Sequence, residues 1–175
     1  MKKFFLFKAV QKHLKFKGVE LGCSLTEFTD KLVNLGDQLM ETSINGVWIK
    51  GEFAGEPDCD FLVKATPKSK IVSEVCVIYD KSLYVDWHSI KSHYFKLKEI
   101  LTKKYGYPKS VEEFTSPYQE GDGLEMVALV REKCNYMSFF KTPVGRIVLS
   151  IGFEKNILVL YEDKSSRAIK EMEEV

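Results

Sequence analysis

Two histidines, His88 and His93, are the residues best suited by type to acid–base or metal chemistry. They stand five apart in a segment with helical periodicity, hence about 140° apart around the axis. Histidines that share a metal ion on one helix face stand four apart instead. Together with Asp86 they mark only an alternative function, a small-ligand binder or enzyme that uses a cleft at the junction between two halves of the chain.

Carboxylates gather at two further places. The loop EGDGLE offers Glu120, Asp122 and Glu125, whose oxygens could bind calcium, but the spacing fits no EF-hand and a glycine-rich hairpin loop is the better interpretation. Asp58 and Asp60 would point to one side of a strand, yet nothing nearby completes an acid–base site. We expect no catalytic residue, no metal and no cofactor.

The four cysteines form no C-x-x-C pair: Cys23, Cys59, Cys76 and Cys134. Cys76 lies in the apolar run VCVIY and is predicted to be a small buried side chain. Cys59 and Cys134 have polar neighbours and could pair in an oxidising compartment. Spacing alone does not give their connectivity, so both states stay open.

Aromatic residues in predicted strands are the remaining signal for a binding site. Side chains alternate along a strand, so Tyr136 shares a face with Ser138 and Phe140. Partner-binding surfaces favour exposed Trp, Tyr and Arg, and Trp48, Tyr136 and Arg146 are the candidate binding residues. The alternative is that most of these aromatic side chains belong to the core.

Charge and length exclude several classes of protein. The chain has 175 residues, with 26 Lys and Arg against 25 Asp and Glu, so the formal net charge is +1. Such a balance supplies no field for nucleic acid, which we do not expect as a partner. No run approaches the roughly 18 apolar residues of a transmembrane span. A protein or peptide is the expected partner.

Residues 1–17 form a lysine-rich segment that begins MKKFFLFK. Lys8 interrupts the apolar run, and no small-residue cleavage site follows, so we expect the segment to be retained and the cytoplasm is favoured. A second interpretation makes it a peripheral membrane arm with one apolar helical face, formed by Phe4, Phe7, Val10 and Leu14.

The elements that must position these residues occur in the same order twice. In residues 18–84, SLTEFTDKLVNLG predicts a helix with a capping box at Ser24 and Glu27, and strands are predicted at 39–44, VWIKGEFAG, CDFLVKA and IVSEVCVIYD. In residues 85–162, a helix capped by Asp86 precedes the predicted strands LEMVALVRE, NYMSFFK, RIVLSIGFE and ILVLYED. Residues 163–175 read as a C-terminal helix or tail.

This order predicts an α+β fold of two tandem helix-plus-antiparallel-sheet repeats. Placed side by side, they would form one continuous curved sheet with helices on one face and an open face on the other. A non-enzymatic binding module that uses the open face is the leading interpretation.

Four stretches carry a resemblance to a known family: HLKFKGVELGCSLTEFTDKLVNLG, GEFAGEPDC, YFKLKEILTKKYG and FFKTPVGRIVLSI. Over roughly residues 13–161 the chain resembles a family of uncharacterised small proteins from gut anaerobes, whose members carry a leader before this region. That resemblance implies export, which the broken apolar run here does not favour. The architecture is similar to the tandem-repeat beta-lactamase inhibitor protein, a topological likeness that transfers no residues.

Overall fold

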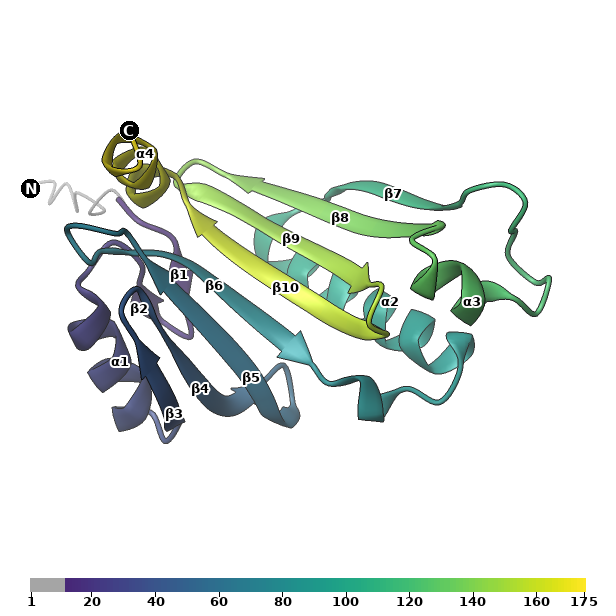
Figure 1. The fold of residues 1–175 in the computed structure, drawn as a ribbon, viewed down its shortest axis with the longest axis horizontal. Helices are drawn as coiled ribbons and strands as arrows, with labels where there is room; N and C mark the ends of the chain where they lie inside the picture. The colour runs from purple at the N-terminus through teal and green to yellow at the C-terminus, as the bar shows by residue number, and fades with distance from the viewer. Residues whose placement is uncertain (1–11) are drawn as a thin grey trace, which may run out of the picture.

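The computed structural model describes residues 12–175 of the chain, and within them eight strands form one antiparallel sheet (Figure 1). The central neighbours β6 and β10 come from distant parts of the chain and pair along six residues each. The α+β class and the large antiparallel sheet are confirmed. In spatial order the strands are β3 (Gln38–Ser43), β4 (Gly46–Phe53), β5 (Glu56–Ala65), β6 (Val72–Tyr79), β10 (Asn156–Asp163), β9 (Gly145–Gly152), β8 (Cys134–Thr142) and β7 (Lys109–Phe114).

Helix α1 (Leu25–Asn34) begins where the capping pattern predicts. The Ser24 hydroxyl accepts a hydrogen bond from the Glu27 backbone N–H at 3.2 Å, which satisfies one of the open donors of the first turn. Phe28 and Leu32, one turn apart, are fully buried in the core. The apolar stripe of α1 therefore faces the sheet as its spacing requires.

Helix α2 (Trp87–Tyr105) also follows its predicted cap. The Asp86 carboxylate accepts from the Ser89 N–H at 2.8 Å. The apolar residues of α2 that recur at spacings of three and four are buried: Trp87, Ile90, Tyr94, Leu97 and Leu101. A short 3-10 helix, Lys81–Leu83, links β6 to this helix.

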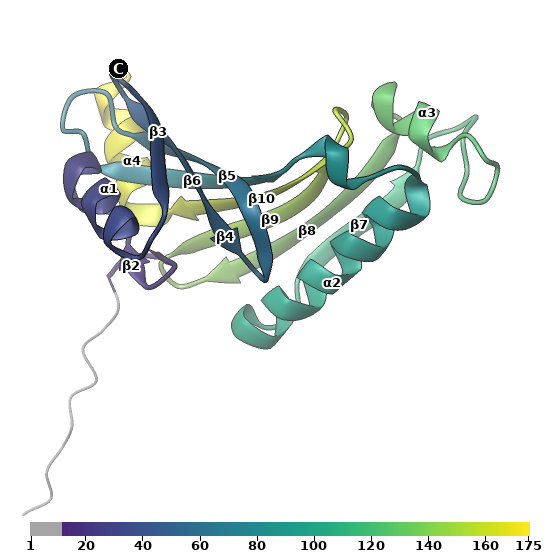
Figure 2. The same cartoon turned by 90° about the horizontal axis from the view of Figure 1, so that it is seen from below.

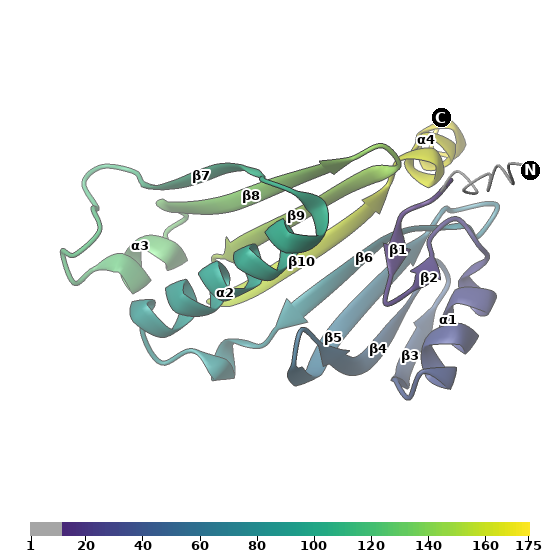
Figure 3. The ribbon, with the colours of Figure 1, turned by 180° about the vertical axis from the view of Figure 1, so that it is seen from behind.

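A small hairpin, β1 (Lys15–Phe16) and β2 (Val19–Glu20), packs against the sheet beside α2 (Figure 3). Phe16 is fully buried, stacked on Phe53 at 5.6 Å between ring centroids and edge-on to Phe61 at 5.1 Å. Leu14 is buried as well, so it does not lie on an exposed membrane-binding face. The other residues of the expected arm, Phe4, Phe7 and Val10, lie outside the described residues.

A buried carboxylate joins this hairpin to the C-terminal helix α4 (Lys164–Glu173). Asp163 is fully buried and accepts hydrogen bonds from the Leu14 N–H at 2.8 Å and the Ser166 N–H at 2.9 Å. Its second oxygen lies 3.0 Å from His13 Nδ1. The carboxylate caps α4 and fixes the start of the hairpin at the same time.

The strand predicted at residues 124–132 is wrong. Those residues contain the helix α3 (Glu125–Val130), which buries Ala128 and Leu129 and exposes Val127 and Val130. The eighth strand of the sheet is instead β7, which pairs with β8 along its whole length. Every residue of β7 except Phe114 is exposed, because this strand is an edge of the sheet.

The two faces of the sheet differ in what lies against them (Figure 2). The covered face carries Phe61, Val77 and Tyr136, and α2 and the β1–β2 hairpin pack on it. Figure 1 looks onto the other side, the uncovered face, and no helix of the described chain lies over its middle. Helix α4 lies at the strand ends and reaches this second face, so the helices do not all share one side. Within residues 12–175, no helix is long and apolar enough to span a membrane.

Candidate functional site

An unbroken line of apolar side chains crosses the uncovered face. Its members, one from each of six neighbouring strands, lie directly opposite one another in the ladder: Trp48, Leu62, Cys76, Leu160, Val148 and Phe139. We call this set the apolar row. Burial raises the pKa of the Cys76 thiol to about 11, so Cys76 is uncharged at neutral pH and belongs with its apolar neighbours. Leu62, next to Trp48 in the row, is 38% exposed.

A second line, two residues further along each strand and about 7 Å away, is charged. This charged row consists of Lys64, Glu74, Glu162, Arg146 and Lys141. Lys64 pairs with Glu74 at 2.8 Å, and Arg146 pairs with Glu162 at 2.7 Å. The uncovered face therefore has an apolar line with a charged line beside it, the arrangement of core and rim found in protein interfaces.

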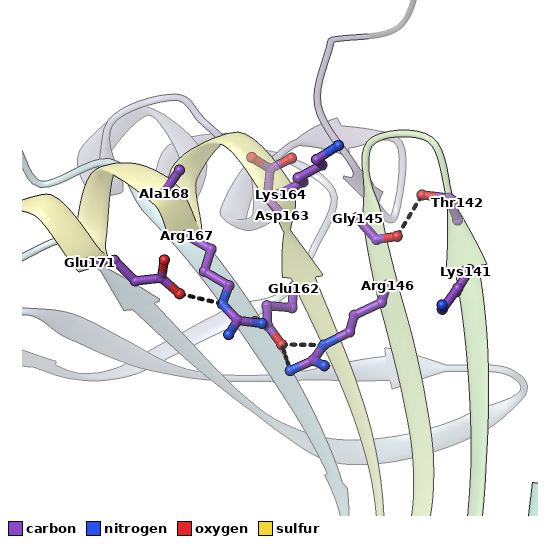
Figure 4. Close-up of a pocket in the computed structure, with 10 residues that line it drawn as sticks. All are labelled: Lys141, Thr142, Gly145, Arg146, Glu162, Asp163, Lys164, Arg167, Ala168 and Glu171. Carbon is purple, nitrogen blue, oxygen red and sulfur yellow. Dashed lines mark hydrogen bonds and ion pairs between the residues drawn. The ribbon is translucent and has the colours of Figure 1, made fainter.

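A groove of about 610 Å³ opens where the charged row meets α4 (Figure 4). Arg167 reaches from α4 to the second oxygen of Glu162 at 2.8 Å and also pairs with Glu171 at 2.8 Å. Arg146 holds the first oxygen of the same carboxylate. A chain of ion pairs thus ties the helix to the sheet and forms one wall of the groove.

Glycine at position 145 allows the strands that carry this wall to approach. A Cβ atom there would collide with the backbone carbonyl oxygen of Glu162 on the paired strand. Gly145 therefore keeps β9 close to β10 and places Arg146 opposite Glu162.

The other end of the apolar row is also hollowed. A groove of about 370 Å³ is lined by Trp48 and Leu62 together with edge-strand residues such as Glu41. Trp48 is half-buried, and its indole Nε1–H donates to Asp60 at 2.7 Å. This bond fixes the nitrogen edge of the ring, while part of the side chain remains accessible.

Of the three predicted binding residues, Trp48 and Arg146 lie on the uncovered face and Tyr136 does not. Tyr136 is only 3% exposed and is on the covered face, where its ring meets Trp87 at 5.0 Å and Tyr94 at 5.7 Å. The expectation that Tyr136 is exposed is therefore wrong. The physical reason is that α2 supplies two aromatic rings that need a partner on the sheet, and Tyr136 is opposite them.

The residues of the alternative junction site do not converge. Asp86 caps α2 and His88 is exposed, whereas the His93 ring turns inward against Tyr79 at 4.8 Å between ring centroids. The Tyr84 hydroxyl lies 2.7 Å from His93 Nδ1. Neither histidine lines the grooves described above.

The other candidates from the sequence are accounted for by local contacts. Glu120 pairs with Lys91, and the Glu125 carboxylate accepts from the Gly121 N–H at 2.7 Å. No group of three metal-ligating side chains occurs among residues 12–175. The four cysteines are all free thiols, so Cys59 and Cys134 do not pair in this structure.

Comparison with known proteins gives no further identification: no family model, no curated protein and no solved structure matches the chain.

Proposed function

We propose that this protein is a non-enzymatic binding module that accepts a segment of a protein partner across its uncovered sheet face. The observation that carries the proposal is the apolar row, which runs over six strands without a charged residue. Contiguous apolar side chains with a polar margin are typical of interaction surfaces.

A repeated organisation supports the same proposal. Strands β3 to β6 follow α1 in the chain, strands β7 to β10 follow α2, and the two groups of four meet at β6 and β10. We infer that they are tandem repeats, which would explain why one broad face extends across both. The resemblance to the family of small proteins from gut anaerobes is likewise a hypothesis, as is the architectural likeness to the beta-lactamase inhibitor protein.

The alternative, a small-ligand binder or enzyme at the junction of the halves, has weaker support. It needs ionisable groups that converge in a cleft. His93 instead packs between tyrosine rings, and His88 is exposed on α2.

Selection of peptides from a random twelve-residue display library on the immobilised protein tests the proposal. We expect enriched sequences, and we expect the double variant Trp48→Ala, Phe139→Ala to bind the synthesised peptides at least about tenfold more weakly, since each lost aromatic contact at an interface costs about 1 kcal/mol or more. Phe139 replaces Tyr136 in this test because Tyr136 is buried.

The matched control changes two exposed apolar residues off the face, Val85→Ser and Tyr107→Ser, which are 89% and 96% exposed. This variant should bind as the wild type does, and circular dichroism should show all variants folded. Failure to enrich any peptide, or equal binding by the face variant and the control, would contradict the proposal.

A further inference from the structure

Four cationic side chains line the groove at the end of the uncovered face (Figure 4). We call them the basic corner: Lys141, Arg146, Lys164 and Arg167. Lys141 and Arg146 stand two residues from Phe139 and Val148 on the same strands and point to the same face. The basic corner is therefore directly continuous with the apolar row.

Lys141 occupies an unfavourable position. Its partner directly across the β8–β9 ladder is Arg146, also a cation, and like charges in directly opposite positions destabilise a sheet. Arg146 bonds to Glu162, on its other side. Among residues 12–175 no carboxylate forms an ion pair with Lys141.

Lys164, the first residue of α4, also lacks a carboxylate partner within the described chain. The helix dipole at this end is compensated by the capping carboxylate of Asp163, but that group is fully buried and is bonded to Leu14, Ser166 and His13 instead of Lys164. Two cations in one groove thus have no carboxylate partner among residues 12–175, and one of them, Lys141, also lies opposite another cation.

The carboxylates of the groove are already occupied. Glu162 receives both arginines, and Glu171 receives Arg167. Asp163 is fully buried and bonded to Leu14, Ser166 and His13. The unsatisfied charge in the basic corner is therefore positive.

We propose that the basic corner binds the carboxylates of the partner, so that the segment recognised by this protein carries apolar side chains followed by acidic ones. Its apolar residues lie on the apolar row and its Asp or Glu side chains bond to Lys141 and Lys164. Departures from local preference, such as Lys141 opposite Arg146, concentrate where a site serves recognition, and an incoming carboxylate supplies the partner that both lysines lack. This inference rests on the proposed function and adds the chemistry of the partner to it.

The test uses a peptide selected on the wild-type protein and its counterpart in which every Asp and Glu is replaced by Asn and Gln. Fluorescence anisotropy measures both against the wild type, the double variant Lys141→Gln, Lys164→Gln, and a control with two exposed lysines changed elsewhere, Lys103→Gln, Lys133→Gln. We expect the wild type and the control to prefer the acidic peptide by about tenfold or more, the gain from one charge-assisted pair. The double variant should lose most of that preference while binding the neutral counterpart unchanged.

The outcomes separate the two proposals. Enriched peptides that show no preference for acidic residues, or a preference that survives in the double variant, would overturn this inference and leave the binding module standing. An absence of any enriched peptide would overturn the proposed function itself.

Discussion

The covered and uncovered faces of one sheet are built from alternate residues of the same strands, yet they are organised differently. On the covered face, Phe61 is fully buried against Phe16, and the polar side chain of Ser138 is hydrogen-bonded to Tyr94 of α2. On the uncovered face, Leu62 is 38% exposed and the cation Lys141 faces another cation. One face is optimised for stability, and the other retains features that stability alone does not explain.

This difference separates two effects of mutation. Substitutions on the covered face should lower the free energy of unfolding, whereas substitutions on the uncovered face should change it little and act on binding. Neighbouring residues of one strand make the contrast sharp, because they share their backbone environment and point to opposite faces.

The largest expected effect is at Phe61. Phe61→Ala should lower the free energy of unfolding by about 3–5 kcal/mol, since it removes a fully buried ring that contacts Phe16. Leu62→Ala, the next residue on the opposite face, should cost less than about 1 kcal/mol. Urea denaturation of both variants measures this, and equal losses would mean that the uncovered face is also part of the core.

The next effect is at the junction of the two faces, where Asp163 ties α4 to the hairpin. Asp163→Ala should cost about 3 kcal/mol, because it removes the cap of α4 and leaves the buried N–H of Leu14 without an acceptor. Ser165→Ala, exposed in the same helical turn, is the control and should cost a few tenths. A loss below 1 kcal/mol for Asp163→Ala in thermal and urea melts would contradict the role assigned to the carboxylate.

The sequence predicts much of this fold because its signals are local. Ser24 and Asp86 cap their helices, and runs rich in Val, Ile and Phe became β4, β5, β6, β8, β9 and β10. The failure at LEMVALV has a physical cause: a short continuous apolar run has no period, so strand and helix are indistinguishable. The sequence does not predict a strand at KSVEEF, because an edge strand exposed to water needs few apolar residues.

The candidate site is less accessible from sequence. The alternation of side chains along a strand correctly places Tyr136 with Ser138 and Phe140, which are all buried. It does not say which of the two sets of side chains in the strand faces α2. The apolar row depends on the register of six strands, some of them paired across more than 80 residues of chain, as Cys76 with Leu160. No local pattern marks Leu62, Leu160 or Lys141 as neighbours of the predicted Trp48 and Arg146.

A smaller effect depends on pH and belongs to the covered side. Burial lowers the pKa of His93, whose ring lies between Tyr79 and Tyr84, with Glu56 and Lys96 as the nearest charges acting on it. The unfolded chain therefore takes up the proton first as the pH falls. Neutral His93 therefore makes its full contribution to stability above about pH 6.5. This contribution decreases as the pH falls from there through the lower pKa of the folded state.

Urea melts at pH 7.5 and pH 5.0 measure this effect. The decrease in stability between the two values should be smaller in His93→Phe than in the wild type, and unchanged in His88→Phe, where the histidine is exposed. If His93→Phe loses as much stability on acidification as the wild type, the ring is not held neutral by its surroundings.

The smallest effect tests the unfavourable charge on the uncovered face without any partner. Lys141→Gln should raise the free energy of unfolding by a few tenths of a kcal/mol, because it removes the like-charge pair with Arg146. Lys64→Gln, at the other end of the same charged row, should lower it by a similar amount, because Lys64 is opposite Glu74 and forms an ion pair with it at 2.8 Å. Both differences in stability should shrink in 1 M NaCl, where the Debye length is only about 3 Å and charge–charge interactions are screened. Opposite signs at low salt would establish that Lys141 opposes folding while Lys64 supports it, and a Lys141→Gln variant less stable than the wild type would remove the electrostatic basis for a carboxylate site in the basic corner.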